Sequence, residues 1–210
     1  MANLEIGIND GVALVGLNRP DARNAVTLQM WRDLANVFAE FDQDDRVRAV
    51  VLSGEGKDFS VGADVSEFDA IRDNRRDAAQ YELSVDACSN SIADLRKPVI
   101  AAVSGYCLGG GCHLALACDF RFAAPSAVFG IPAANLSIVY GVRSVQRLLA
   151  LVGVANAKRV LFTAGRFDAT ASREIGLVDE ISDDCAASAV SFAASMAHLA
   201  PLSIAGAKYM

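Results

Sequence analysis

The sequence is poor in the side chains that bind metals. Its 210 residues include two histidines, His113 and His198, which lie far apart, and five cysteines that form no CxxC pair. Zinc sites need several such ligands at short spacings, so we expect no metal site. An odd number of cysteines within apolar segments also argues against a disulfide framework. It favours buried, reduced thiols in a cytoplasmic protein.

Positive charge is scarce as well, and no targeting signal is visible. The formal net charge is −6 and no basic cluster occurs, so we expect no nucleic-acid partner, although a local cationic pocket for a phosphorylated ligand is compatible with this charge. The N-terminal residues MANLEIGIND lack the basic and apolar regions of a secretory signal.

The stretch 99–118 is long enough to span a bilayer, but it contains four glycines and runs into Asp119. That pattern predicts a buried strand, a turn and a helix, and no membrane partner.

The chain also lacks repeats, low-complexity segments and Pro/Ser-rich linkers. Its hydrophobic content of 53% is enough for one well-packed core and too little for two large domains. Strand-like and helix-like periods alternate along the whole sequence, which is typical of a single α/β domain. We assign residues 1–195 to this domain.

Local patterns place the first elements. Residues 12–17 are apolar and β-branched, which predicts a strand, and the turn residues 18–21 end it. Thr27 is placed to cap a helix whose apolar residues recur every three or four positions from Leu28 to Phe41. Two further runs, 49–52 and 99–103, are continuously apolar, as strands covered on both faces are. A second helix is expected over about 76–95.

The segment GYCLGGGCHLALACD, residues 105–119, follows the last of these strands. Three successive glycines at a strand-to-helix junction leave several amide N–H groups unpaired, and such a corner binds negative charge. The same glycines are also compatible with nothing more than tight packing of helix against strand. A phosphate loop is excluded because no GK[ST] follows and GxGxxG is not matched.

A second corner has the same character. Residues 59–64, FSVGAD, place small residues after the strand at 49–52 and before an expected helix that Asp64 would cap. One backbone donor from each corner could converge on a single oxygen. Two such donors would stabilise a thioester carbonyl as it becomes an enolate.

Five motifs in this order carry a resemblance to a known family: LNRPDARNAV, FSVGADVSEF, KPVIAAVSGYCLGGGCHLALACDFRFA, FGIPAANL and TAGRFDATASREIGLVDEI. From about Val12 onward the chain resembles the crotonase superfamily of enoyl-CoA hydratases and isomerases. The resemblance implies a crotonase-like spiral of ββα units, with a mostly parallel sheet core and surrounding helices. It also implies a homotrimer or a dimer of trimers, and no permanently bound cofactor, because coenzyme A is part of the acyl-CoA substrate.

The resemblance also implies roles for individual residues. Ala63 and Gly110 match the two backbone donors to the thioester carbonyl. The loop with Arg23 matches the coenzyme A contact region and makes Arg23 a candidate phosphate partner, although a solvated surface arginine is an equal alternative. The full set of residues expected to bind substrate is Ala22, Arg23, Ala25, Gly62, Asp64, Val65, Tyr106, Leu108, Gly109, Pro132, Ala133, Asn135 and Ile138.

The sequence departs from the family pattern at two positions. Hydratases of this family carry one glutamate in a GGGCE segment and one in an FGxPE segment, where this chain has His113 and Ala133. Ala133 cannot transfer a proton. His113 is a candidate catalytic acid or base, and near a helix N-terminus its neutral form is favoured. The alternative is a neutral histidine that fills the cavity.

A local likeness to another branch involves Tyr140. Methylmalonyl-CoA decarboxylase of the same superfamily has an Asn-Leu pair followed by a tyrosine that orients the departing carboxylate, and Asn135, Leu136 and Tyr140 match that spacing. We therefore include Tyr140 among the candidate catalytic residues, with Ala63, Gly110 and His113. The alternative is a packed aromatic ring whose hydroxyl is satisfied by a neighbour.

These observations predict an enzyme that acts on an acyl-CoA thioester through a stabilised enolate. With both hydratase glutamates replaced, isomerase, decarboxylase or other lyase chemistry is favoured over plain hydration. The alternatives are an acyl-CoA-binding protein that has kept the donors and lost the bases, and a structural subunit of a mixed oligomer. The resemblance further implies that residues 196–210 begin a C-terminal helical region that is truncated here.

Overall fold

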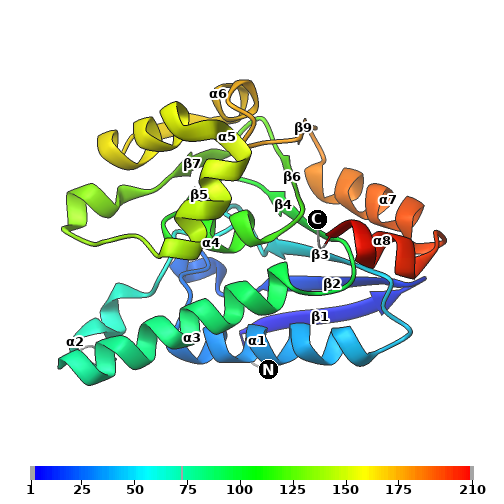
Figure 1. Ribbon diagram of the computed structural model, residues 1–210, viewed down its shortest axis with the longest axis horizontal. Coiled ribbons are helices and arrows are strands. Elements are labelled where there is room, and N and C mark those ends of the chain that lie inside the picture. The colour runs from blue at the N-terminus through cyan, green and yellow to red at the C-terminus, as the bar shows by residue number, and fades with distance from the viewer. Residues whose placement is uncertain (1–2, 72, 209–210) are drawn as a thin grey trace.

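The computed structural model describes residues 3–71 and 73–208, and its strands form two sheets (Figure 1). The large sheet has the order β1-β2-β3-β4-β6-β9. Only β1 and β2 pair antiparallel there; the other neighbours are parallel. The bounds are β1 Leu4–Asn9, β2 Val12–Leu17, β3 Ala49–Gly54, β4 Val99–Val103, β6 Phe120–Ala123 and β9 Glu180–Ile181.

The small sheet has the order β5-β7-β8, with bounds β5 Tyr106–Leu108, β7 Val128–Gly130 and β8 Arg166–Asp168. Two successive units connect the sheets: β4, β5 and α4, then β6, β7 and α5. In each unit the first strand joins the large sheet, the second joins the small sheet, and a helix follows. This arrangement confirms the expected α/β fold of ββα units around a mostly parallel core.

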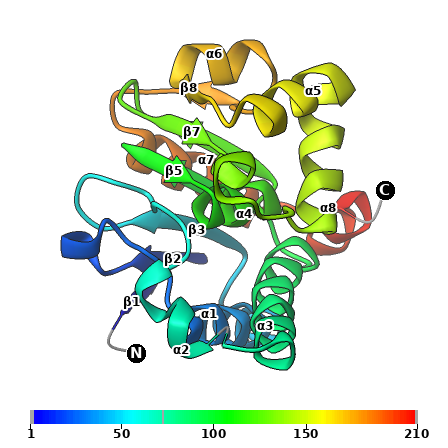
Figure 2. The ribbon, with the colours of Figure 1, turned by 90° about the vertical axis from the view of Figure 1, so that its left-hand side faces the viewer.

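The helices enclose the sheets from several sides. Figure 1 shows α1 and α3 next to one another along the lower edge and α5 and α6 above the sheets, while Figure 2 shows α5 descending toward α3. The helix bounds are α1 Leu28–Gln43, α2 Phe68–Ile71, α3 Arg75–Ala93, α4 Gly110–Ala117, α5 Val142–Thr163, α6 Ala169–Glu174, α7 Cys185–Ala197 and α8 Pro201–Lys208. The described residues also form three short 3-10 helices: η1 Pro20–Ala22, η2 Val65–Glu67 and η3 Pro132–Leu136.

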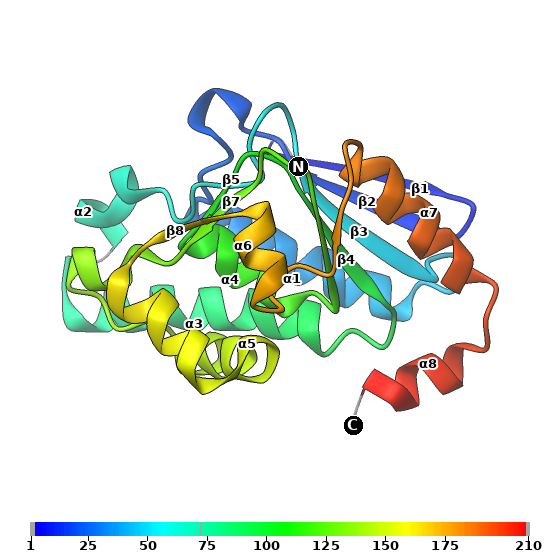
Figure 3. The same ribbon diagram turned by 90° about the horizontal axis from the view of Figure 1, so that it is seen from above.

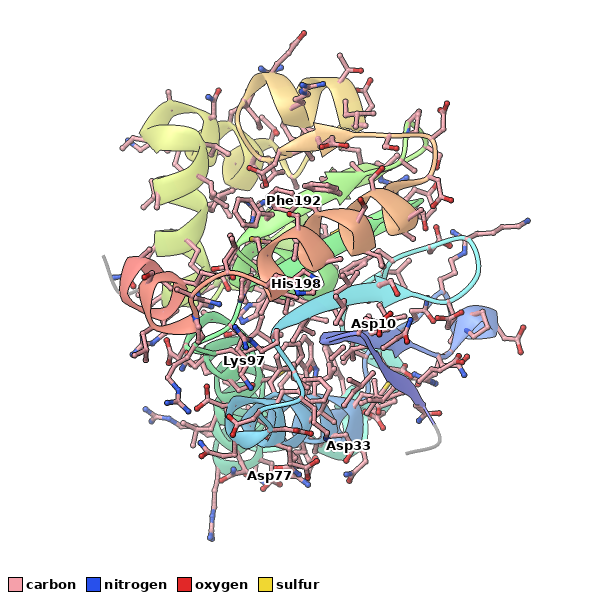
Figure 4. All side chains as sticks on the ribbon, turned by 90° about the vertical axis from the view of Figure 1, so that its right-hand side faces the viewer. Asp10, Asp33, Asp77, Lys97, Phe192 and His198 are labelled. Atoms are coloured by element: carbon pink, nitrogen blue, oxygen red, sulfur yellow. The ribbon has the colours of Figure 1, made fainter. Side chains whose placement is uncertain are left out.

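The continuous apolar strands are covered on both faces, as predicted. On β3, Val50 and Leu52 face the main core beneath α1, whereas Ala49 and Val51 face a second core cluster beneath α7. Side chains alternate between the two faces of a strand, so both faces of this sheet must be apolar. Figure 4 shows α7 lying across the outer face, where Phe192 packs against Phe120 with 5.0 Å between ring centroids.

Two local predictions are confirmed and one is corrected. The Thr27 hydroxyl accepts a hydrogen bond of 3.1 Å from Met30 N and caps α1. Strand β2 has the expected bounds, Val12–Leu17. The junction after β4 is more complex than expected, because the three-residue strand β5 lies between β4 and α4. The five cysteines are all buried and none is in a disulfide.

The C-terminal part of the described chain consists of α7 and α8. The boundary expected at residue 195 falls within α7, close to its end, and residues 209–210 lie outside the described range. Figure 3 shows α8 at one edge of the molecule, where Lys208 Nζ lies 2.8 Å from Asp119 Oδ2. No single helix in residues 3–71 and 73–208 is long and apolar enough to cross a bilayer; α7 and α8 meet that test only together, bent by 115°.

Candidate active site

The three-glycine corner opens on a cavity of about 160 Å³ between α1, α3, α4 and the segment 131–141. Its wall is mostly apolar and includes ten of the residues expected from the sequence. These ten are Gly62, Ala63, Val65, Gly109, Gly110, His113, Pro132, Ala133, Ile138 and Tyr140. The two corners and the two positions that depart from the family pattern therefore meet in one place.

The corners at Ala63 and Gly110 approach each other closely. A Cβ atom placed on Gly110 would lie 2.9 Å from Ala63 N, and one placed on Gly62 would lie 2.9 Å from Gly110 N. Within the described part of the chain, neither Ala63 N nor Gly110 N donates to a protein acceptor. Both line the cavity. Two unpaired amides on the wall of one cavity are able to donate to a single oxygen atom within it.

A network of hydrogen bonds fixes the Ala63 corner. The Ser60 hydroxyl donates to Asn24 O at 2.7 Å and accepts from Gly62 N at 3.1 Å. Asp64 N donates to Val26 O at 2.9 Å. These bonds engage the amides on either side of Ala63 and hold the backbone of this corner in place. Gly62 has φ +103°, a conformation that a residue with a Cβ rarely adopts.

His113 lies one turn after Gly110 on α4 and is buried. Its Nδ1 is 2.7 Å from Ser144 Oγ of α5, whereas its Nε2 is buried and has no hydrogen-bond partner among the described residues. Burial, and to a smaller degree the positive charge of Arg147, lowers the pKa of His113 to about 4. The ring is therefore neutral at neutral pH, as expected, although burial and not the helix start is the main cause.

Tyr140 packs edge-on against His113, with 5.9 Å between the ring centroids. Its hydroxyl donates to Gly109 O at 2.9 Å. Burial raises the pKa of this hydroxyl well above its ordinary value, so it stays protonated. The bond supports the three-glycine corner, and it matches the expected alternative of a packed aromatic ring with a satisfied hydroxyl.

Carboxylates are scarce around the cavity. Ala133, in η3, and His113 both line it, and neither supplies a carboxylate. Among the described residues that form the wall, the one acidic side chain is Glu82 of α3. The arrangement can polarise a carbonyl and offer a neutral imidazole, but it does not present a pair of carboxylates to one water molecule.

The loop expected to contact coenzyme A lies beside the cavity rim. Arg23 O accepts a hydrogen bond from Val61 N, and Val61 lines the cavity. The Arg23 side chain is 60% exposed, lies 3.8 Å from Asp58 and stacks over Tyr106 at 5.4 Å. Arg166 contacts the same ring at 5.3 Å. Two positively charged side chains, Arg23 and Arg166, therefore lie against the ring of Tyr106, although the net charge of the protein is negative.

Asp64 has a structural role at this rim. It caps η2 by accepting from Ser66 N and forms an ion pair of 2.8 Å with Arg19. Hydrogen bonds from Ser66, and then the bond from Arg19, lower the pKa of Asp64. The residues expected at the site that do not line the cavity are Ala22, Arg23, Ala25, Asp64, Tyr106, Leu108 and Asn135.

Several residues of the cavity wall were not predicted as site residues from the sequence. Trp31 was expected only on a buried helix face, yet it lines the cavity and its Nε1 donates to Tyr81 Oη at 3.2 Å. Tyr81 and Glu82, from α3, also line the cavity. Helical periodicity marks Tyr81 as buried but does not reveal that its neighbours enclose a cavity. Ser144 carries no sequence signal, because only the fold brings it to His113.

Comparison with known proteins identifies the family of this chain. Residues 7–210 match the model of the family described as enoyl-CoA hydratase/isomerase. YngF of Bacillus subtilis, named as an enoyl-CoA hydratase/isomerase, is 37% identical over 205 residues, which cover 96% of this chain and 78% of that protein. The short-chain-enoyl-CoA hydratase of Clostridium acetobutylicum is 40% identical over 171 residues, 81% of this chain and 65% of its own length.

A solved structure shows the same fold. The crystal structure of an enoyl-CoA hydratase/carnithine racemase from Magnetospirillum magneticum superposes with a TM-score of 0.95 at 34% identity, covering 100% of this chain and 79% of that one. The fold is therefore that of the crotonase superfamily. The chain belongs to the enoyl-CoA hydratase/isomerase family.

Proposed function

We propose that this protein is an enzyme that binds an acyl-CoA thioester with its carbonyl between Ala63 N and Gly110 N and stabilises the enolate formed there. The observation that carries the proposal is the pair of unpaired amides facing one cavity. Negative charge that develops on the thioester oxygen would be held by both donors. Donors of this kind lower a barrier by several kcal/mol, about 3 for one of them.

The proposal includes a preference among reactions. Concerted hydration needs two groups that position one water and move its protons. Here Ala133 cannot do so and His113 is a neutral, buried imidazole. Isomerisation, or decarboxylation that leaves the enolate directly, therefore fits this wall better than plain hydration. The same features also fit an acyl-CoA-binding protein without turnover.

The test is incubation with a panel of acyl-CoA thioesters and mass spectrometry of the products. The panel should include crotonyl-CoA, a β,γ-unsaturated enoyl-CoA and a malonyl-type CoA. We expect the protein to convert the β,γ-unsaturated enoyl-CoA or the malonyl-type CoA. Hydration of crotonyl-CoA should be slower than in a two-glutamate enzyme by a factor of about 10². Hydration of crotonyl-CoA at an ordinary enzymatic rate would refute the preference, and binding without any conversion would leave only a binding function.

A further inference from the structure

Aromatic rings form much of the cavity wall, and they are in contact with one another. The five rings, in the order of their contacts, are Phe68, Tyr81, Trp31, His113 and Tyr140. Phe68 meets Tyr81 edge-on with 5.7 Å between ring centroids, and Trp31 Nε1 donates to Tyr81 Oη. His113 packs edge-on against Trp31 at 6.2 Å and against Tyr140 at 5.9 Å. We call this continuous series the aromatic arc.

The rings of the aromatic arc come from five different parts of the fold, namely α2, α3, α1, α4 and the segment that precedes α5. Trp31 is fully buried, and Tyr81 and His113 are nearly so. Phe68 and Tyr140, at the two ends of the arc, are half-buried and line the cavity. The end rings therefore keep the most accessible surface, and the inner rings hold them in position.

Aliphatic side chains also line the cavity, and the most exposed of them are Val65, Leu136 and Val139. These three side chains lie where the cavity meets the solvent. The buried aliphatic side chains of the wall are Val85 and Ile131. The mouth of the cavity is therefore aliphatic, whereas its interior is mostly aromatic.

The size of the cavity suits a single ring. Its volume is about 160 Å³. An apolar cavity of about 150 Å³ in another protein takes up a benzene molecule. The cavity therefore has room for one six-membered ring on a short link from the thioester carbonyl.

We infer that the acyl group of the substrate carries an aromatic ring, which the aromatic arc binds beside the glycine corner. The inference rests on the proposed function. Trp31 Cζ2 lies 3.2 Å from a Cβ placed on Gly110, so the arc adjoins the position proposed for the thioester carbonyl. Rings that meet edge-to-face or offset gain binding free energy beyond that of buried apolar area, whereas a saturated group gains only the latter. The β,γ-unsaturated and malonyl-type acyl groups favoured above both have a carbon that can carry such a ring.

The first test compares phenylacetyl-CoA and cyclohexylacetyl-CoA, two thioesters of equal carbon number, by titration calorimetry. Phenylacetyl-CoA corresponds to a phenyl-substituted malonyl-CoA after loss of CO₂. The saturated ring has the larger apolar surface, so burial alone would make cyclohexylacetyl-CoA the tighter ligand. Wild type should instead bind phenylacetyl-CoA about fivefold more tightly, the effect of one favourable ring pair. Equal affinities or the reverse order would overturn the inference.

The second test separates ring contacts from selection by size. Phe68→Leu keeps an apolar side chain but removes the ring at one end of the arc, so the preference for phenylacetyl-CoA should fall to about twofold or less. Phe162→Leu is the matched control and should keep the full preference, because Phe162 is exposed on α5 and lies outside the cavity wall. Circular dichroism verifies folding, and Tyr140→Leu, at the other end of the arc, replaces Phe68→Leu if that variant does not fold. An unchanged preference in the folded variant would overturn the inference.

Butyryl-CoA, titrated alongside, distinguishes failure of the inference from failure of the proposed function. Wild type that binds butyryl-CoA as tightly as phenylacetyl-CoA, or more tightly, would overturn the inference while the proposed function stands. Wild type that binds none of the three thioesters would instead refute the proposed function.

Discussion

A Cβ atom on Gly110 would lie 2.9 Å from the amide nitrogen of Ala63. Residues from two distant corners of the chain thus meet so closely that only glycine fits at this position. A side chain at this position would press against the Ala63 amide, one of the two proposed donors. The close approach therefore connects the glycine-rich sequence to the proposed chemistry, and it can be tested by mutation.

Gly110→Ala keeps its own N–H, but its methyl group would press against the Ala63 amide and obstruct that donor. We expect kcat/KM for any acyl-CoA substrate to fall by a factor of about 10²–10³, the usual effect of losing one oxyanion donor. The added methyl would also lie 3.2 Å from Trp31 Cζ2, so it has no room to move aside. Gly206→Ala, where nothing lies within 4 Å of an added Cβ, is the control. Steady-state kinetics measures both variants, and circular dichroism verifies their folding. Full activity in Gly110→Ala would contradict the account.

Acid should destabilise the protein through His113. The unfolded chain binds this proton near pH 6.5 and the folded protein only near pH 4, so the stabilisation is complete above 6.5 and is lost as the pH falls. The loss over that window should be about 3 kcal/mol. The charged groups around His113 are Arg147 on α5 and, on α3, Glu82 of the same cavity wall and Asp86 on the other side of Gly141. Urea unfolding from pH 7 to 4 should show a steeper decline in wild type than in His113→Gln; parallel curves would exclude this cause.

Arg23→Ala should weaken binding of coenzyme A about fivefold, which corresponds to about 1 kcal/mol for an exposed ion pair. The difference should shrink in high salt because the charges are screened. Arg46→Ala is the matched control, since Arg46 is 79% exposed and pairs with Asp44 away from the cavity. Titration calorimetry at low and high salt measures both. Equal affinities for the two variants would assign Arg23 to the ordinary solvated surface.

Tyr140→Phe distinguishes support of the glycine corner from direct catalysis. Loss of the hydrogen bond to Gly109 O should lower the free energy of unfolding by about 1 kcal/mol. Activity should fall by less than about tenfold, because the hydroxyl is already engaged by the protein. Thermal unfolding and kinetics on the same preparation measure the two effects. A much larger loss of kcat without a change in stability would show that the hydroxyl acts on substrate.

The fold could be predicted wherever local chemistry is strong. Strand β2 has the expected bounds because turn residues follow it directly, and Thr27 caps α1 as its hydroxyl predicts. Strand β5 was missed because it has three residues and lies among glycines, so it shows no period. The glycine corners were visible from sequence. The Ser144 contact was not, because it joins two helices that only the packing of α5 on α4 brings together.

The most direct measurement of the central proposal is isotope-edited infrared spectroscopy of a thioester labelled with ¹³C at its carbonyl. It reports polarisation of that bond and needs no turnover. Bound to wild type, the labelled carbonyl of butyryl-CoA should absorb at lower frequency than in water, because two fixed amides in a mostly apolar cavity weaken the C=O bond. In Gly110→Ala most of that shift should disappear, and in Gly206→Ala it should remain. A thioester that binds wild type with an unshifted carbonyl would contradict the assignment of Ala63 and Gly110 as the oxyanion hole.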